Sequence, residues 1–263
     1  MIRHYVTFSD PQGDYDMIIH SYENSLRADT CIEYLRGIDK VRGCDKVVLL
    51  PIPTTRDNKM ILNTKVCIDE LIEIIDGGTV VCGYGIPKSF TTRALEKAAL
   101  VIDLSEDEEF LLENAELTAL ATLGIFLGST KFSPRDSKIG VVGYGRIGKR
   151  LTAMLLYLGA EVRVFTSREN TRLDLCACGV STVMSTENSN LSGLDLLVNT
   201  APAVIFTADA IPDGLRIIDL ASGDNFPEIA GVEKYPSVPA KMFPISAGRA
   251  WGRAVERRLV KNK

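Results

Sequence analysis

Residues 138–168 read KIGVVGYGRIGKRLTAMLLYLGAEVRVFTSR. An apolar strand at 139–142 leads into three glycines with the spacing G-x-G-x-x-G, namely Gly143, Gly145 and Gly148, and a helical pattern follows to residue 158. A second apolar strand at 162–165 completes a strand-turn-helix-strand unit of about 30 residues, the context in which this motif binds dinucleotides.

Each glycine has a distinct purpose in such a turn. Gly143 permits the tight turn, Gly145 lets the backbone approach a pyrophosphate, and Gly148 lets the helix lie close to the sheet. The helix begins near Arg146 and Ile147, and its free N–H groups favour an anion. We therefore predict that a dinucleotide binds here; the alternative is a glycine-rich turn without a ligand.

The end of the second strand bears on the choice of dinucleotide. An NAD site carries Asp or Glu at this place, where it binds the adenosine ribose. Here the chain has Thr166, Ser167 and Arg168 instead. A hydroxyl and a planar guanidinium suit the ribose phosphate of NADP, so we predict NADP, with NAD as the other possibility. Alternatively, Arg168 is a solvated surface charge.

Composition excludes several classes of protein. The net charge of −4 gives no reason to expect nucleic acid as a partner, and 46% apolar residues suffice for buried sheets. Arg3 and Asp10 interrupt the N-terminal region, so we expect no signal peptide. The apolar segment 117–127 is shorter than a bilayer span, so we expect a buried helix and a cytoplasmic protein without membrane contact.

Cysteine and histidine are placed unfavourably for metal binding. The six cysteines form no C-x-x-C pair, and Cys176 and Cys178, the closest couple, have no histidine nearby. The two histidines, His4 and His20, both lie near the N-terminus. We expect reduced thiols and no metal site.

Strand and helix patterns alternate from residue 46 onward. This alternation predicts an α/β protein of two Rossmann-like domains with parallel sheets, joined by a long interdomain helix. We expect a substrate domain at 1–113 and a nucleotide-binding domain at 114–263. The second includes a linker helix at 114–130 and a C-terminal helix at 247–260.

Loops after several predicted strands are expected to meet in a cleft between the domains. These loops lie at 51–57, 83–88, 143–148, 200–203 and 222–226. The cofactor-lining residues expected from the last two are Asn199, Thr200, Ala201, Pro202 and Ser222.

Several motifs, in order along the chain, resemble the family formed by the A subunits of dipicolinate synthase. They are VVLLPIPTTRD (47–57), NAELTA (114–119), the glycine turn, NTAP (199–202), IDLAS (218–222) and PAKMFPISAG (239–248). The resemblance implies a pyridine-nucleotide oxidoreductase that converts dihydrodipicolinate, or its hydrated precursor, to pyridine-2,6-dicarboxylate on a branch of the lysine pathway. It also implies a role in sporulation and a partner, the flavoprotein-like B subunit of the synthase. We further expect a homo-oligomer.

The chain departs from the family mainly in the substrate half. The family's N-terminal glycine-glycine-aspartate turn is missing, and Gly223-Asp224-Asn225 stands where the family has proline-glycine-glycine. Ser246 replaces a threonine, and Thr118 replaces a glycine.

The implied reaction requires groups that bind two carboxylates, a task suited to Arg or Lys. Arg56 is the first candidate, followed by Lys88 and Lys241; each could instead be a surface charge. Glu116 stands where the family has its glutamate. It could act as a base, orient the nicotinamide amide, or complement the dipole at the start of the linker helix.

Two other functions are compatible with the sequence. A D-2-hydroxyacid dehydrogenase shares the two-domain plan but uses a late histidine as acid-base, and no histidine follows His20 here. A nucleotide-binding partner or sensor protein without turnover would explain the altered substrate half.

Overall fold

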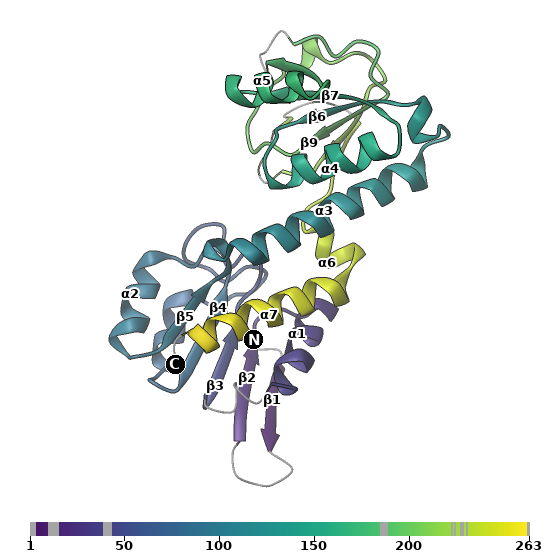
Figure 1. Ribbon diagram of the computed structural model, residues 1–263. Coiled ribbons are helices and arrows are strands. Elements are labelled where there is room, and N and C mark those ends of the chain that lie inside the picture. Colours follow the sequence, from purple (N-terminus) through teal and green to yellow (C-terminus); the bar gives the residue numbers. More distant parts are fainter. Residues whose placement is uncertain are drawn as a thin grey trace. The chain divides into compact units, whose positions relative to one another are not determined.

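The computed structural model describes residues 4–9, 16–38, 44–184, 189–221, 223, 225–226, 229 and 231–261. They form two compact units (Figure 1). Unit 1 comprises Met1–Asn114 and Phe243–Lys263, and unit 2 comprises Ala115–Met242. The predicted α/β fold with two sheets is confirmed, and the first boundary falls within one residue of the expected one.

Unit 1 contains a five-stranded sheet in the order β1-β2-β3-β4-β5. Its strands are parallel except β1, which is antiparallel to β2. The elements are β1 (His4–Ser9), β2 (Asp16–Ser21), α1 (Leu26–Arg36), β3 (Lys46–Leu49), η2 (Ile68–Glu73), β4 (Thr79–Gly83), α2 (Lys88–Glu96), β5 (Leu100–Asp103), η3 (Leu104–Glu106) and the C-terminal α7 (Pro244–Lys261).

Two of these elements have unusual starts or lengths. The segment 66–75 contains only the short 3-10 helix η2. Helix α2 begins after Pro87, which makes no side-chain cap. Proline is favourable at a helix start because its missing N–H would have no partner there.

Both faces of the unit 1 sheet are covered. Helices α1 and α7 pack on one face, around Ile19, Leu49 and the fully buried Trp251 (Figure 1). Elements η2 and α2 cover the other face, around Val48 and Phe90. Strands buried on both sides explain the continuous apolar runs in the sequence.

The C-terminal helix lies in a different unit from the one expected. It was assigned to the nucleotide-binding domain, but α7 belongs to unit 1. The reason is its close packing on α1: a Cβ at Gly248 would lie 2.4 Å from the Arg27 carbonyl oxygen, and one at Gly252 would lie 2.4 Å from Tyr34 Cδ1. The Trp251 indole also donates to Cys82 Sγ at 3.2 Å, so burial and this bond fix α7 on the sheet.

Unit 2 contains a six-stranded sheet that is parallel throughout, in the order β11-β10-β9-β6-β7-β8. Its elements are η4 (Pro134–Asp136), β6 (Lys138–Val142), α4 (Arg146–Tyr157), β7 (Glu161–Thr166), α5 (Glu169–Ala177), β8 (Ser181–Met184), β9 (Leu196–Asn199), η5 (Ala208–Ala210), β10 (Arg216–Asp219), β11 (Val232–Lys234) and α6 (Val238–Met242). The chain order reverses between β6 and β9, and this switch point is where a doubly wound sheet binds nucleotides.

Helix α3 (Glu108–Ser129) connects the two units and begins earlier than expected. The expected linker helix began at residue 114, but Glu108 and Glu109 form the first turn of α3, where negative charge is favourable. The Asp107 carboxylate accepts the Phe110 N–H at 2.9 Å and so caps it.

Charged side chains join the start of α3 to α7 within unit 1. Arg257 Nη2 lies 2.9 Å from Asp107 Oδ1, and Arg253 pairs with Glu113. Burial opposes ionisation of Asp107, but the Phe110 N–H and Arg257 outweigh it and lower the pKa of this carboxyl.

Helix α3 is also the one helix among the described residues long and apolar enough to cross a membrane by length and composition. The segment 117–127 alone was expected to be too short, but the helix has 22 residues. Phe110 packs in the core of unit 1, and Ala119 and Phe126 pack in the core of unit 2. The apolar window of α3 is 39% buried.

Candidate functional site

The glycine turn lies at the carboxyl end of the central strand β6. Gly143 has a φ of +86°, which a side chain would strain, and its N–H donates to the Phe165 carbonyl at 2.8 Å. A Cβ at Gly148 would lie 2.2 Å from the Gly143 carbonyl oxygen. Both glycines are therefore required by the chain's own packing, as the motif predicts.

Gly145 is different, because a Cβ there would meet no protein atom within 4 Å. Its φ of −81° suits any residue, so neither packing nor backbone geometry explains a glycine at this position. Gly145 is also the N-cap of α4, and no side chain caps that helix start. A nucleotide pyrophosphate fits this turn, since it requires close backbone approach and accepts helix N–H groups.

Side chains of the first turns of α4 surround this site. Arg146 is exposed and Ile147 is half-buried, and both lie in the first turn, as expected. The Lys149 ammonium lies 5.7 Å from the centre of the Tyr144 ring, which places a further positive charge beside the glycine turn. The local charge therefore favours an anion.

The loop after β9 is bonded directly to the glycine turn. Thr200 Oγ1 donates to the Val142 carbonyl at 2.8 Å, and the Thr200 N–H donates to the same oxygen at 2.9 Å. Ala201 is half-buried and Pro202 is exposed. The sheet thus brings together two of the loops that the sequence predicts at the nucleotide site.

Asn199 has a mainly structural position. Its Nδ2 donates to the Ala201 carbonyl at 3.0 Å and to Asp219 Oδ1 at 2.8 Å, while its Oδ1 accepts the Ala201 N–H at 3.1 Å. Asp219 also accepts from Asn225 Nδ2, at 3.3 Å. This buried network shapes the loop after β9, and its members Asp219 and Asn225 were not expected from the sequence. The only signals were that Asp219 ends a predicted apolar strand and that Asn225 lies in the predicted loop 222–226.

The residues expected at the adenosine ribose lie at the end of β7, beside β6. Thr166 is buried, and its Oγ1 accepts the Arg168 N–H at 3.2 Å. Ser167 and Arg168 are exposed, and Arg168 is the N-cap of α5. Ser222, the last expected cofactor residue, lies outside the described residues.

In unit 1, Arg56 lies in an exposed loop after β3. Asp57 Oδ1 orders this loop by accepting the N–H groups of Met60 at 2.8 Å and Lys59 at 2.9 Å, and these bonds lower the Asp57 pKa. Arg56 has no ion pair or hydrogen bond within the part of the chain that the structure describes. Its guanidinium is therefore available for a ligand.

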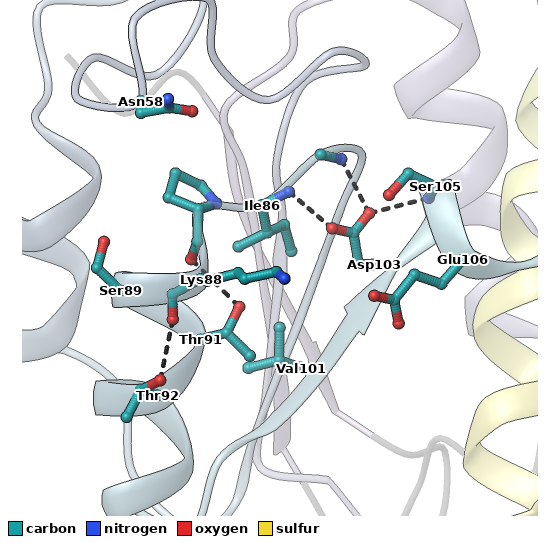
Figure 2. Close-up of a pocket in the computed structure, with 12 residues that line it drawn as sticks. Asn58, Ile86, Lys88, Ser89, Thr91, Thr92, Val101, Asp103, Ser105 and Glu106 are labelled. Carbon is teal, nitrogen blue, oxygen red and sulfur yellow. Dashed lines mark hydrogen bonds between the residues drawn. The ribbon is translucent and has the colours of Figure 1, made fainter.

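The expected catalytic residue Glu116 and the expected substrate-binding residue Lys241 lie in unit 2. Glu116 is exposed in the third turn of α3, so complementing the helix dipole, one of its expected roles, is excluded. Lys241 is exposed in the short helix α6. Lys88 lies in unit 1, where it lines a pocket (Figure 2).

The described residues contain no group of three or more metal-ligating side chains. His20 is buried in β2, and burial followed by the charge of Lys46 lowers its pKa. Cys82 is buried, and burial raises its pKa to about 12. Neither group has the accessibility expected of an acid-base or nucleophilic residue.

The fold and the glycine turn define a two-unit α/β chain whose second unit has the doubly wound sheet of a Rossmann fold. No protein-family model matches the chain. It is similar to the dipicolinate synthase A subunit of Bacillus subtilis (strain 168), with 24% identity over 161 residues, which cover 57% of this chain and 54% of that protein. The match therefore spans about half of the length of the curated relative.

Solved structures share the architecture. The dipicolinate synthase A subunit from Bacillus halodurans has a TM-score of 0.67 at 24% identity, covering 85% of this chain and 82% of that one. An NAD-complexed D-isomer specific 2-hydroxyacid dehydrogenase from Lactobacillus delbrueckii ssp. bulgaricus has a TM-score of 0.54 at 11% identity, covering 93% and 96%. The chain thus shares its fold with these two proteins, and the expected resemblance to dipicolinate synthase A subunits is confirmed.

Proposed function

We propose that this chain is a nicotinamide-dependent oxidoreductase that binds its dinucleotide at the turn between β6 and α4. The observation that carries the proposal is Gly145, a glycine that neither packing nor backbone geometry requires. It lies at the switch point of the sheet, beside the loop held by Thr200. A pyrophosphate is the ligand that such a turn accommodates.

The preferred dinucleotide in this proposal is NADP. Ser167 and Arg168 are exposed at the end of β7, the place where an NAD site has a carboxylate. The guanidinium and hydroxyl would hold the ribose phosphate, and the Thr166 side chain already fixes the Arg168 backbone. Arg168→Ala should therefore weaken NADP binding more than NAD binding.

The proposed substrate is a dihydropyridine dicarboxylate such as dihydrodipicolinate, and the product is pyridine-2,6-dicarboxylate. Nicotinamide accepts the hydride, and the aromatising ring gives up one proton. Arg56 is the proposed carboxylate-binding residue, with Lys241 as a second cation, and Glu116 is the proposed base. Arg56 supports this assignment because its guanidinium has no partner among the described residues.

A thermal-unfolding experiment tests substrate binding. Dipicolinate, the product, should raise the unfolding temperature when NADP is present and have no effect alone. Arg56→Ala should remove this stabilisation, whereas Lys59→Ala, a change in the same exposed loop, should retain it. Absence of any effect on the wild type at millimolar dipicolinate would exclude this substrate class.

A second candidate is a nucleotide-binding protein or sensor without turnover. Its support is Asn199, whose polar atoms are all used in the network with Ala201 and Asp219. Binding of NADP without conversion of dihydrodipicolinate would favour this function. A D-2-hydroxyacid dehydrogenase is less well supported, because both histidines of the chain precede residue 21.

The proposed setting is a cytoplasmic homo-oligomer that works with the flavoprotein-like B subunit of the synthase during sporulation. Its support is the similarity to the A subunit of dipicolinate synthase. Co-expression with a candidate flavoprotein-like partner, followed by size-exclusion chromatography, tests both the oligomer and the partner. A single monomeric peak that lacks the partner would contradict both.

A further inference from the structure

A pocket of about 710 Å³ lies within unit 1 (Figure 2). It is formed by the loop after β4, the first turns of α2, and the residues at and after the end of β5. Its volume is in the range of small-molecule sites, and its place at the carboxyl ends of parallel strands is where α/β sheets bind ligands. No residue of the glycine turn contributes to it.

Asp103 forms one wall of the pocket, but its carboxylate oxygens already accept hydrogen bonds from the backbone. Its two carboxylate oxygens accept the N–H groups of Gly85 and Ile86, both at 2.8 Å. Its Oδ1 also accepts the Ser105 N–H at 2.9 Å. Figure 2 shows these three bonds, which hold the loop after β4 against the end of β5. Asp103 therefore shapes the pocket, while its charge still contributes a negative potential.

Two other charged groups in the pocket are free to bind a ligand. Lys88 and Glu106 form no ion pair or side-chain hydrogen bond with the described part of the chain. In Figure 2, Lys88 extends its ammonium toward the side of the pocket where Asp103 and Glu106 lie. The side chains of Asn58 and Ser89 add polar groups that likewise form no such bond. Ile86, Pro87 and Val101 supply apolar surface.

The balance of charge specifies the kind of ligand. One cation, Lys88, stands with two carboxylates, Asp103 and Glu106. A dicarboxylate would place its second negative charge near two carboxylates, which is unfavourable. A molecule with one carboxylate and one amine would instead pair both of its charges, with Lys88 and with Glu106.

We propose that this pocket binds a small zwitterion with a carboxylate and an amine, joined by an apolar chain. Lys88 binds the carboxylate, Glu106 binds the amine, and the apolar wall contacts the chain. This site is separate from the nucleotide site and does not depend on the proposed oxidoreductase activity. It also gives Lys88 a different ligand from the dicarboxylate expected from the sequence.

Calorimetric titration without nucleotide tests the proposal. The probes are two zwitterions, 6-aminohexanoate and 5-aminopentanoate, and three controls, hexanoate, hexylamine and adipate. At least one zwitterion should bind saturably in the millimolar range, and each control should bind about tenfold more weakly, since it lacks a charge-assisted contact. No saturable binding of either zwitterion, or equal binding of adipate, would overturn the proposal.

Two variants assign the charges. Lys88→Met should reduce binding of the zwitterion to the level of hexylamine, and Glu106→Gln should reduce it to the level of hexanoate. Matched controls are Lys97→Met and Glu96→Gln, exposed changes at the other end of α2 that should bind as the wild type does. Unchanged binding in both pocket variants would contradict the proposal. Gly145→Val should leave this binding intact, so loss of nucleotide binding is a separate outcome.

Discussion

Two glycines of the same turn should respond differently to substitution. At Gly148 an added Cβ would lie 2.2 Å from the Gly143 carbonyl oxygen and 3.0 Å from its carbon, so backbone must move. At Gly145 the added atom would meet no protein atom within 4 Å. We therefore expect Gly148→Ala to reduce stability, and Gly145→Val to reduce nucleotide binding while the fold persists.

The expected losses of unfolding temperature and of NADP affinity can be estimated for each variant. Overpacking costs about 1–3 kcal/mol, and each kcal/mol lowers the unfolding temperature of a chain of this size by about 2–4 °C, so Gly148→Ala should lose about 2–12 °C. An N-cap change from glycine to valine costs at most about 1 kcal/mol, so Gly145→Val should lose less than about 4 °C. Its NADP affinity should fall more than about tenfold, the effect of losing roughly 1.4 kcal/mol.

Differential scanning fluorimetry and NADPH fluorescence titration measure the two effects on the same samples. Gly128→Val is the matched control, because a Cβ there also meets nothing within 4 Å and the residue lies in the last turn of α3. It should bind NADPH as the wild type does. Normal NADPH binding by Gly145→Val, or its unfolding at as low a temperature as Gly148→Ala, would contradict the different roles of the two glycines.

Three further predictions concern other parts of the chain. Arg168→Ala should weaken NADP about 10- to 150-fold, the effect of losing a charged contact of about 1.5–3 kcal/mol, and leave NAD unchanged; equal weakening in titrations would count against the phosphate site. Gly252→Ala should lower the unfolding temperature, because its Cβ would lie 2.4 Å from Tyr34 Cδ1, whereas Gly128→Ala should not. Folding lowers the pKa of the Asp107 carboxyl below its unfolded value of 3.8. The ionised carboxylate therefore stabilises the fold above pH 3.8, and this contribution is lost as the pH falls through the folded pKa. Urea unfolding between pH 6 and 2 should therefore show a smaller acid loss in Asp107→Asn; an identical loss would contradict this.

Much of the fold could be predicted because it depends on local sequence patterns. The buried parallel strands are continuous apolar runs such as 139–142, and the glycine spacing marks the turn after β6. The position of α7 could not be predicted, because it depends on contacts between residues far apart in sequence, such as Gly252 with Tyr34. The start of α3 was missed since its acidic first turn resembles a loop in composition.

The candidate sites were predictable to a different degree in the two units. In unit 2 a sequence motif fixes both the backbone and the place of Gly145. In unit 1 no motif connects Lys88 with Glu106, which are brought together by the loop that Asp103 holds. Such a pocket follows from side-chain bonds across strand ends, and the sequence alone gives only the residue types.

Hydrogen–deuterium exchange with and without NADP tests the nucleotide site most directly, because it reports binding by position along the chain. We expect slower exchange of amides at 143–149, 166–169 and 200–203 at saturating NADP, with no change at 85–106. Slower exchange confined to other segments, or none at saturating NADP, would contradict the claim that the turn after β6 binds the dinucleotide.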